Sequence, residues 1–135
     1  MKADVTVNRE RVVPTETKVS SDVLVAASVL EDHKASDVVV LDLREISSAT
    51  DYFIIASGSS PVHVRALGER VIDGLAARRV RLHHTEGSER GRWMLLDFVD
   101  FVVHVFHPEL REFYQLERLW GDAPLVFDGS SSQRR

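Results

Sequence analysis

Residues 93–106 decide the fold of this chain; they read WMLLDFVDFVVHVF. Two apolar runs, 93–98 and 101–106, flank the dipeptide Val99-Asp100. Apolar runs of this length on either side of a short connection are typical of two paired antiparallel strands. We therefore predict a β-hairpin here, followed by a helix that begins at Pro108.

Side chains alternate along a strand, so the predicted hairpin has two faces. A short connection with an even number of residues fixes which side chains share a face. One face is apolar throughout and belongs to the core; it consists of Met94, Leu96, Phe98, Phe101, Val103 and Val105. The other face is mixed; it consists of Trp93, Leu95, Asp97, Val102, His104 and Phe106. A second buried layer and an exposed patch for a partner explain the mixed face equally well.

The connection contains Val99 where a two-residue hairpin turn needs a positive φ angle. A β-branched residue adopts that angle only at a cost in free energy. We therefore expect a wider or bulged turn between the two strands. Both kinds of turn keep the face assignments.

The residues upstream predict alternating helices and strands. Ser20 to Asp22 offer an N-cap, and Gly58 to Pro61 is typical of a strand-to-helix turn with proline at the first helical position. The predicted elements are a helix from about residue 23 to Lys34, a strand at 38–43, a strand at 52–57, a helix at 61–77 and a weak strand at 80–84. A strand–helix–strand unit favours parallel strands 52–57 and 80–84 with a right-handed crossover.

The helix at 61–77 separates into two faces. Its apolar face, which we expect to pack on the sheet, consists of Val64, Leu67, Gly68, Val71 and Leu75. Arg65, Glu69 and Asp73 lie on the opposite side. The predicted fold is therefore α/β: a single domain with a mixed five-stranded sheet and helices packed on it.

Length and composition indicate one domain, since the chain has 135 residues, 44% of them apolar and 28% charged. We expect a flexible N-terminal arm at 1–19, a folded domain at 20–127 and a disordered tail at 128–135. The arm lacks the apolar segment of a secretory signal, and no run approaches the roughly 18 apolar residues that span a bilayer. A cytoplasmic protein without membrane insertion is therefore expected.

The absence of cysteine excludes disulfides and thiolate metal sites. The formal charge of −4 argues against a protein whose main contacts are nucleic-acid phosphates. Five arginines gather loosely in the middle of the chain but are interrupted by acids, which favours a solvated rim; they are Arg78, Arg79, Arg81, Arg90 and Arg92. An acidic protein fits a basic protein surface better.

Catalytic patterns are incomplete. The Gly58-Ser59 turn resembles the phosphate-binding turn of nucleotidyltransferases, which is followed by paired acids that hold magnesium. Here Asp73 lies on the outer helix face and has no second acid. The histidines form no set of three with a carboxylate, and Ser59 lacks the Gly-x-Ser-x-Gly elbow. We therefore predict no catalytic, cofactor or metal site.

The chain resembles the ribosomal silencing factor family, also called RsfS or Iojap. The resemblance covers about residues 21–122 and is carried by Thr50-Asp51, Ser57-Gly58-Ser59, His63, Trp93, Leu96-Asp97, Asp100, Val103-His104-Val105, Arg111, Phe113-Tyr114, Leu116-Glu117 and Leu119-Trp120-Gly121-Asp122. The family usually has glycine where this chain has Val99.

The resemblance implies a non-catalytic protein with a nucleotidyltransferase-like fold that lacks the catalytic acids. Family members bind the large ribosomal subunit through its protein L-fourteen, block joining of the small subunit and repress translation when nutrients are scarce. Organellar relatives are linked to assembly of the large subunit, and some members are homodimers when free. Little direct contact with nucleic acid is expected.

The candidate partner-binding residues come from the mixed face, the predicted last helix and the family motif. They are Trp93, Leu95, Asp97, His104, Tyr114, Glu117, Leu119 and Trp120. A large-subunit assembly factor is an alternative that uses the same surface. A second alternative is a degenerate nucleotidyltransferase-like enzyme that uses Ser59, His63 and Asp97.

Overall fold

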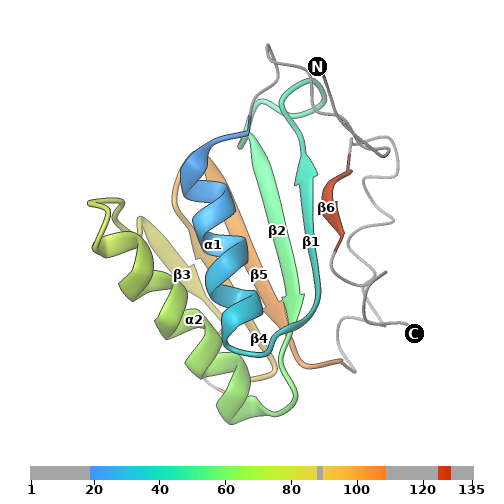
Figure 1. Ribbon diagram of the computed structural model, residues 1–135, viewed down its shortest axis with the longest axis vertical. Coiled ribbons are helices and arrows are strands. Elements are labelled where there is room, and N and C mark those ends of the chain that lie inside the picture. The colour runs from blue at the N-terminus through green and yellow to red at the C-terminus, as the bar shows by residue number, and fades with distance from the viewer. Residues whose placement is uncertain (1–18, 88–89, 109–124, 129–135) are drawn as a thin grey trace.

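The structure, a computed structural model, describes residues 19–87, 90–108 and 125–128. The predicted arm up to residue 18, the predicted helix beyond Pro108 and the predicted tail from residue 129 lie outside the described residues. The elements in chain order are α1 (Ser21–Asp32), β1 (Ser36–Asp42), β2 (Tyr52–Ser57), α2 (Pro61–Ala76), β3 (His84–Glu86), β4 (Trp93–Asp97), β5 (Phe101–Phe106) and β6 (Leu125–Asp128) (Figure 1). The α/β class is confirmed.

The sheet is mixed, as predicted, and its strand order is β3-β4-β5-β2-β1-β6. β2 pairs in parallel with β5, and the other four neighbouring pairs are antiparallel. The five predicted strands are present, and β6 adds a sixth beside β1. β6 has four residues, too few to show a strand period against the loops around it.

The weak strand predicted at 80–84 lies further along, as β3. It runs in the same direction as β2, in agreement with the predicted parallel arrangement. However, β4 and β5 lie between β3 and β2. The hairpin β4–β5 inserts there because β5 is apolar on both faces and belongs in the centre of the sheet.

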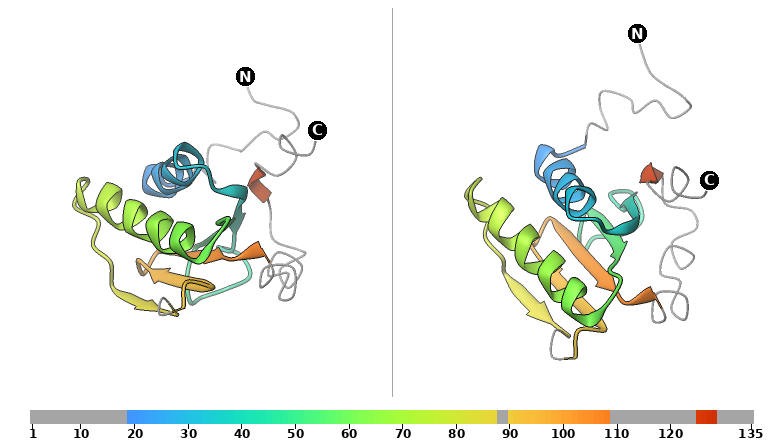
Figure 2. Two further views of the ribbon diagram at one scale, coloured as in Figure 1. Left: turned by 90° about the horizontal axis from the view of Figure 1, so that it is seen from below. Right: turned by 60° about the horizontal axis from the view of Figure 1, so that its bottom comes forward.

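Both helices cover the same face of the sheet (Figure 2). Ser60 caps α2 by accepting a hydrogen bond from the His63 N–H at 3.1 Å, and Ser20 caps α1 in the same way from the Asp22 N–H at 3.2 Å. The predicted apolar face of α2 is buried, as is the corresponding face of α1. Arg78, just after α2, donates to the Asp22 carboxylate of α1 at 2.8 Å.

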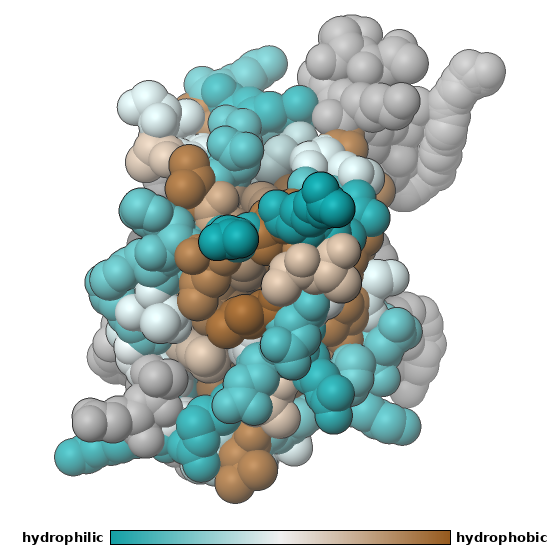
Figure 3. Space-filling view, turned by 90° about the vertical axis from the view of Figure 1, so that its left-hand side faces the viewer, coloured by the Kyte–Doolittle hydropathy of each residue, from teal (hydrophilic) through white to brown (hydrophobic). Residues whose placement is uncertain are grey.

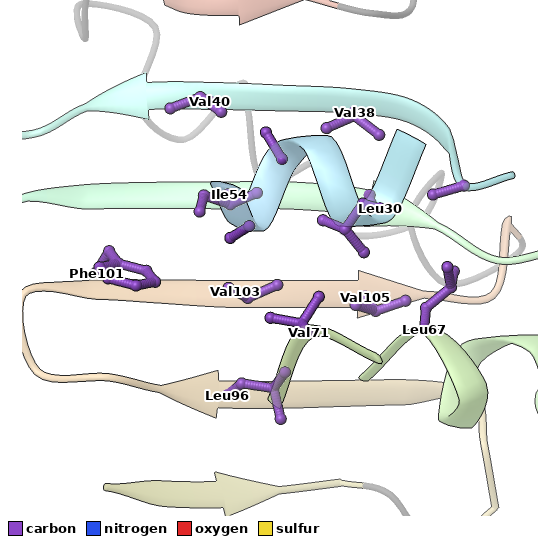
Figure 4. Packing of buried hydrophobic residues seen from close by; sticks show 14 of the residues in the cluster. Leu30, Val38, Val40, Ile54, Leu67, Val71, Leu96, Phe101, Val103 and Val105 are labelled. Carbon is purple, nitrogen blue, oxygen red and sulfur yellow. The ribbon is translucent and has the colours of Figure 1, made fainter. Parts of the chain in front are cut away.

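The main core lies between these helices and the sheet. In Figure 4 side chains of both helices point towards those of the central strands; the labelled residues are Leu30, Val38, Val40, Ile54, Leu67, Val71, Leu96, Phe101, Val103 and Val105. Four of these residues, Leu96, Phe101, Val103 and Val105, belong to the hairpin face that was predicted to be core. Within the described residues, no helix has the length and apolar character needed to cross a membrane.

The hairpin register confirms both predicted faces. Leu96 pairs with Val103 on the apolar face, and Leu95 pairs with His104 on the mixed face. The Phe98 N–H donates to the Phe101 carbonyl at 2.9 Å, which leaves Val99 and Asp100 as a two-residue connection. The expectation of a wider or bulged turn was therefore wrong.

Val99 adopts a φ of 77°, the angle that a valine was expected to avoid. The Asp100 N–H donates to the Phe98 carbonyl at 2.9 Å, the three-residue hydrogen bond of a γ-turn. The side chain of Asp97 accepts the Val99 N–H at 2.8 Å, and the Thr50 hydroxyl donates to the Val99 carbonyl at 3.2 Å. These bonds offset the cost of the left-handed valine, and the one from Thr50 comes from a residue far away in the sequence.

Gly68 permits the close approach of α2 to β4. A Cβ atom at Gly68 would lie 2.3 Å from the Met94 Sδ atom. At Gly74, two turns further along α2, an added Cβ would lie 3.2 Å from the nearest heavy atom, the Val29 Cγ2. The two glycines thus differ in how much room a methyl group has.

We expect Gly68→Ala to lower the free energy of unfolding by about 1–2 kcal/mol, because overpacking outweighs the better helix propensity of alanine. The matched change Gly74→Ala should be neutral or stabilising by up to about 1 kcal/mol. Urea unfolding of both variants measures the difference. Equal stability of the two variants would contradict the close packing of α2 on β4.

Candidate partner-binding face

The face of the sheet opposite α1 and α2 carries the predicted mixed surface. We call it the helix-free face because no described helix covers it; among described residues it includes Val39, Leu41, Phe53, Ile55, Trp93, Leu95, Asp97, Val102, His104 and Phe106. Four of the eight predicted site residues, Trp93, Leu95, Asp97 and His104, come together here on β4 and β5. The other four, Tyr114, Glu117, Leu119 and Trp120, lie outside the described residues.

Burial changes across this face. A second, smaller core is built from Val39, Leu41, Leu43, Ile55 and Phe106, with Phe53 and Trp93 packed against it. Towards β4 the side chains of Trp93, Leu95 and Asp97 are half-buried. The two interpretations of the mixed face therefore apply to different parts of it: buried layer at the centre, accessible surface along β4.

Four aromatic rings lie in a row across three strands of this face. The Phe53 and His104 ring centroids are 4.7 Å apart in an edge-on arrangement, and the rings of His104 and Phe106 are parallel at 6.0 Å. The Trp93 ring stacks on Phe106 at 6.4 Å. Aromatic pairs at these separations stabilise one another by about 0.5–1.5 kcal/mol beyond the area that they bury. The row therefore gives the face a fixed shape.

His104 is 7% exposed, and both of its ring nitrogens lack a hydrogen-bond partner in the described structure. Burial lowers the pKa of His104 from 6.5 to about 4, so its ring is neutral at pH 7. The Trp93 indole N–H is also buried and has no such partner. Each buried polar group without a partner costs roughly 1–3 kcal/mol, so these nitrogens are kept at the expense of stability.

Asp97 has a local structural role. One of its oxygens accepts the Val99 N–H, which fixes the carboxylate at the end of β4 beside the turn. Asp100 is exposed and belongs to the turn, as predicted. Asp97 therefore presents a half-buried, oriented carboxylate at the accessible side of the helix-free face.

The residues of the enzyme alternative are not brought together. Ser59 and His63 lie where β2 leads into α2, whereas Asp97 pairs with Val102 at the other end of the sheet. Phe53, which pairs with Val102, and Ser57 are four positions apart on β2, which corresponds to roughly 13 Å. Ser59 and Asp97 therefore cannot act together on one reacting group.

His63 connects two loops instead. Its Nε2 atom donates to the His33 carbonyl at 2.9 Å, so Nδ1 is the acceptor for the Ser59 N–H at 2.9 Å. The Ser59 hydroxyl lies 3.1 Å from the same Nδ1 atom. Both nitrogens of the ring are thus used to hold the start of α2 against the end of α1.

Sequence reasoning missed Phe53 as part of this site. Phe53 reaches His104 because β2 lies beside β5 with Phe53 paired to Val102. The run 52–57 is apolar on both faces and gives no indication of its neighbour. A period-two pattern assigns side chains to faces but does not say which strands are adjacent.

The buried neutral His104 makes stability dependent on pH. Its pKa is about 4 in the folded protein against 6.5 in the unfolded chain, so the unfolded chain takes up the proton first as pH falls. We expect the free energy of unfolding to fall by about 3 kcal/mol from this group between pH 6.5 and 4. His104→Leu should remove that part of the dependence. Urea unfolding at several pH values tests this; an unchanged acid slope in His104→Leu would contradict it.

Comparisons with known protein sequences point to one family. The family described as "Ribosomal silencing factor during starvation" matches residues 16–135. The chain is 42% identical over 102 residues to the ribosomal silencing factor RsfS of Bacillus subtilis, covering 76% of this chain and 86% of that protein. It is 33% identical over 102 residues to "Mitochondrial assembly of ribosomal large subunit protein 1" of Mus musculus, covering 73% of this chain and 45% of that protein.

Solved structures show the same fold. A crystal structure of a Chromobacterium violaceum protein superimposes with a TM-score of 0.74 at 36% identity, covering 77% of this chain and 87% of that one. A Bacillus halodurans protein gives a TM-score of 0.70 at 36% identity, covering 80% and 99%. Sequence and fold lead to one conclusion: this chain belongs to the ribosomal silencing factor family, RsfS or Iojap.

Proposed function

We propose that this protein binds the large ribosomal subunit through its protein L-fourteen and prevents the small subunit from joining. The result is repression of translation under nutrient limitation in the cytoplasm. The observation that supports this most is the accessible side of the helix-free face, where Leu95 and Asp97 lie on β4 beside the aromatic row that ends in Trp93. The names of the bacterial relatives support the ribosomal context.

The chemistry of this face suits a protein partner. Tryptophan is enriched among the few residues that supply most of the binding energy in such interfaces. Trp93 is half-buried, so the exposed part of its ring can pack against side chains of L-fourteen. The Asp97 carboxylate offers a charge to a basic ribosomal protein.

The proposed mechanism is steric and needs no turnover. Residues 20–127 act as the ribosome-binding domain, and its volume excludes the small subunit from the surface that it occupies. The free protein forms a homodimer. No catalytic residue is required, and the separation of Ser59 from Asp97 is consistent with this.

Assembly of the large subunit is the second candidate function. The mouse relative is named as an assembly protein of the mitochondrial large subunit. Both functions use the same docking surface, but they differ in which ribosomal particles accumulate when the protein is absent. Incomplete large-subunit particles would favour assembly, whereas complete subunits that join too readily during starvation would favour silencing.

Binding to isolated subunits tests the proposed function directly. The protein should pellet with large subunits and not with small ones, and its addition should reduce the yield of joined ribosomes in a subunit-joining assay. Equal pelleting with both subunits, or with neither, would overturn the proposal.

A charge on the accessible side of the face should block docking. We expect Leu95→Arg to weaken large-subunit binding by roughly 30-fold or more, the equivalent of about 2 kcal/mol at a central interface residue. The matched control is Ser28→Arg, at an exposed position on α1, which should bind as the wild type does. Pelleting assays measure affinity, and thermal melts verify that both variants are folded. Equal affinity of the two variants would place the interface elsewhere.

A further inference from the structure

Gly91 brings three arginines together at one end of the sheet. This residue is buried, has a φ of 68° and lies just before β4. A Cβ atom there would lie 2.5 Å from the Pro61 carbonyl oxygen and 2.7 Å from the Arg65 Nη1 atom. The backbone at Gly91 therefore presses against the first turns of α2, which holds its neighbours Arg90 and Arg92 beside Arg65.

The three arginines carry positive charge and have no ion-pair partner among the described residues. Arg90 and Arg92 are exposed and Arg65 is half-buried, and none of them forms a salt bridge or side-chain hydrogen bond with another described residue. Glu69 lies one turn along α2 from Arg65 but makes no ion pair with it. Glu86, in nearby β3, is hydrogen-bonded to His84, so no described acid pairs with the three arginines although the chain has a net charge of −4.

The arginine cluster adjoins the candidate partner-binding face. A Cβ atom at Gly87, where the chain leaves β3, would lie 2.4 Å from the Cε3 atom of Trp93. Trp93 follows Arg92 directly and belongs to the helix-free face. Figure 3 views the molecule from the α2 and β3 side, where hydrophilic residues surround an apolar area. Arg65 lies on α2, across the sheet from that face, so a partner that covers Trp93 meets the cluster only if it extends past the end of the sheet where β4 begins.

We propose that Arg65, Arg90 and Arg92 bind the phosphate backbone of ribosomal RNA beside the protein partner on the large subunit; this rests on the proposed function. Guanidinium groups match phosphate oxygens in geometry and keep their charge at every physiological pH. The large subunit exposes RNA phosphates next to its proteins, so a docked protein meets both. The net negative charge limits RNA to a second, local contact, whose task is to fix the orientation of the protein.

Salt dependence of large-subunit binding distinguishes a phosphate contact from a protein contact. The test variant is Arg65→Gln/Arg90→Gln/Arg92→Gln. The matched control is Arg70→Gln/Arg79→Gln/Arg81→Gln, which removes the same charge from three exposed arginines elsewhere. The test variant should lower the slope of log affinity against log salt by about 2–3, since each phosphate contact contributes just under one. The control should keep the wild-type slope.

Between 50 and 200 mM salt, wild-type affinity should therefore fall roughly 15- to 60-fold more than that of the test variant. A wild-type slope in the test variant, or an equal loss in the control, would overturn the inference. Thermal melts check that the variants fold. If Arg65→Gln impairs folding, the double variant Arg90→Gln/Arg92→Gln, which changes exposed residues only, takes the place of the test variant.

A labelled A-form RNA duplex separates this inference from the proposed function. Fluorescence anisotropy should show weak, salt-sensitive binding that the test variant loses and the control retains. If the wild type binds the duplex through these arginines but does not pellet with large subunits, the proposed function fails and the phosphate site stands. If the wild type binds neither, both fail.

Discussion

The parallel pairing of β2 with β5 is the contact on which the rest of the structure depends. It runs in continuous register from Tyr52 with Phe101 to Ser57 with Phe106. β2 also pairs with β1, and β5 also pairs with β4, both in the antiparallel direction. The parallel pair β2–β5 therefore joins two hairpin-like units into a single sheet. Strands that are apolar on both faces are driven to this central position because any other place would expose one face to water.

The two faces of this central pair of strands are covered to different extents. The face that carries Ile54 and Val103 is covered by α1 and α2 and forms the main core. The opposite face carries Phe53, His104 and Phe106, which form a ring row with Trp93. Burial there decreases towards β4, and polar nitrogens remain without partners. A surface built for stability alone would replace His104 with an aliphatic residue, because a buried imidazole without hydrogen bonds costs free energy.

Much of the fold follows from the order of residues along the chain. The apolar spacing of α2, its serine cap and its proline start are local properties, and the structure confirms them. The two hairpin faces also follow, because an even-numbered connection forces Leu96 opposite Val103. The positive φ angle of Val99 cannot be inferred from the local sequence, because Thr50 and Asp51, far away in the sequence, donate hydrogen bonds to the turn.

For the candidate site, the sequence by itself determined that Trp93, Leu95, Asp97 and His104 share one face, because side-chain alternation is a property of each strand. It also determined the family, through motifs that need no coordinates. Only the tertiary structure decided that Phe53 lies against His104, that Ser59 and Asp97 are at opposite ends of the sheet and that Arg65 meets Gly91. Each of these depends on which elements are neighbours, and neighbours are chosen by the packing of the whole chain rather than by any local pattern.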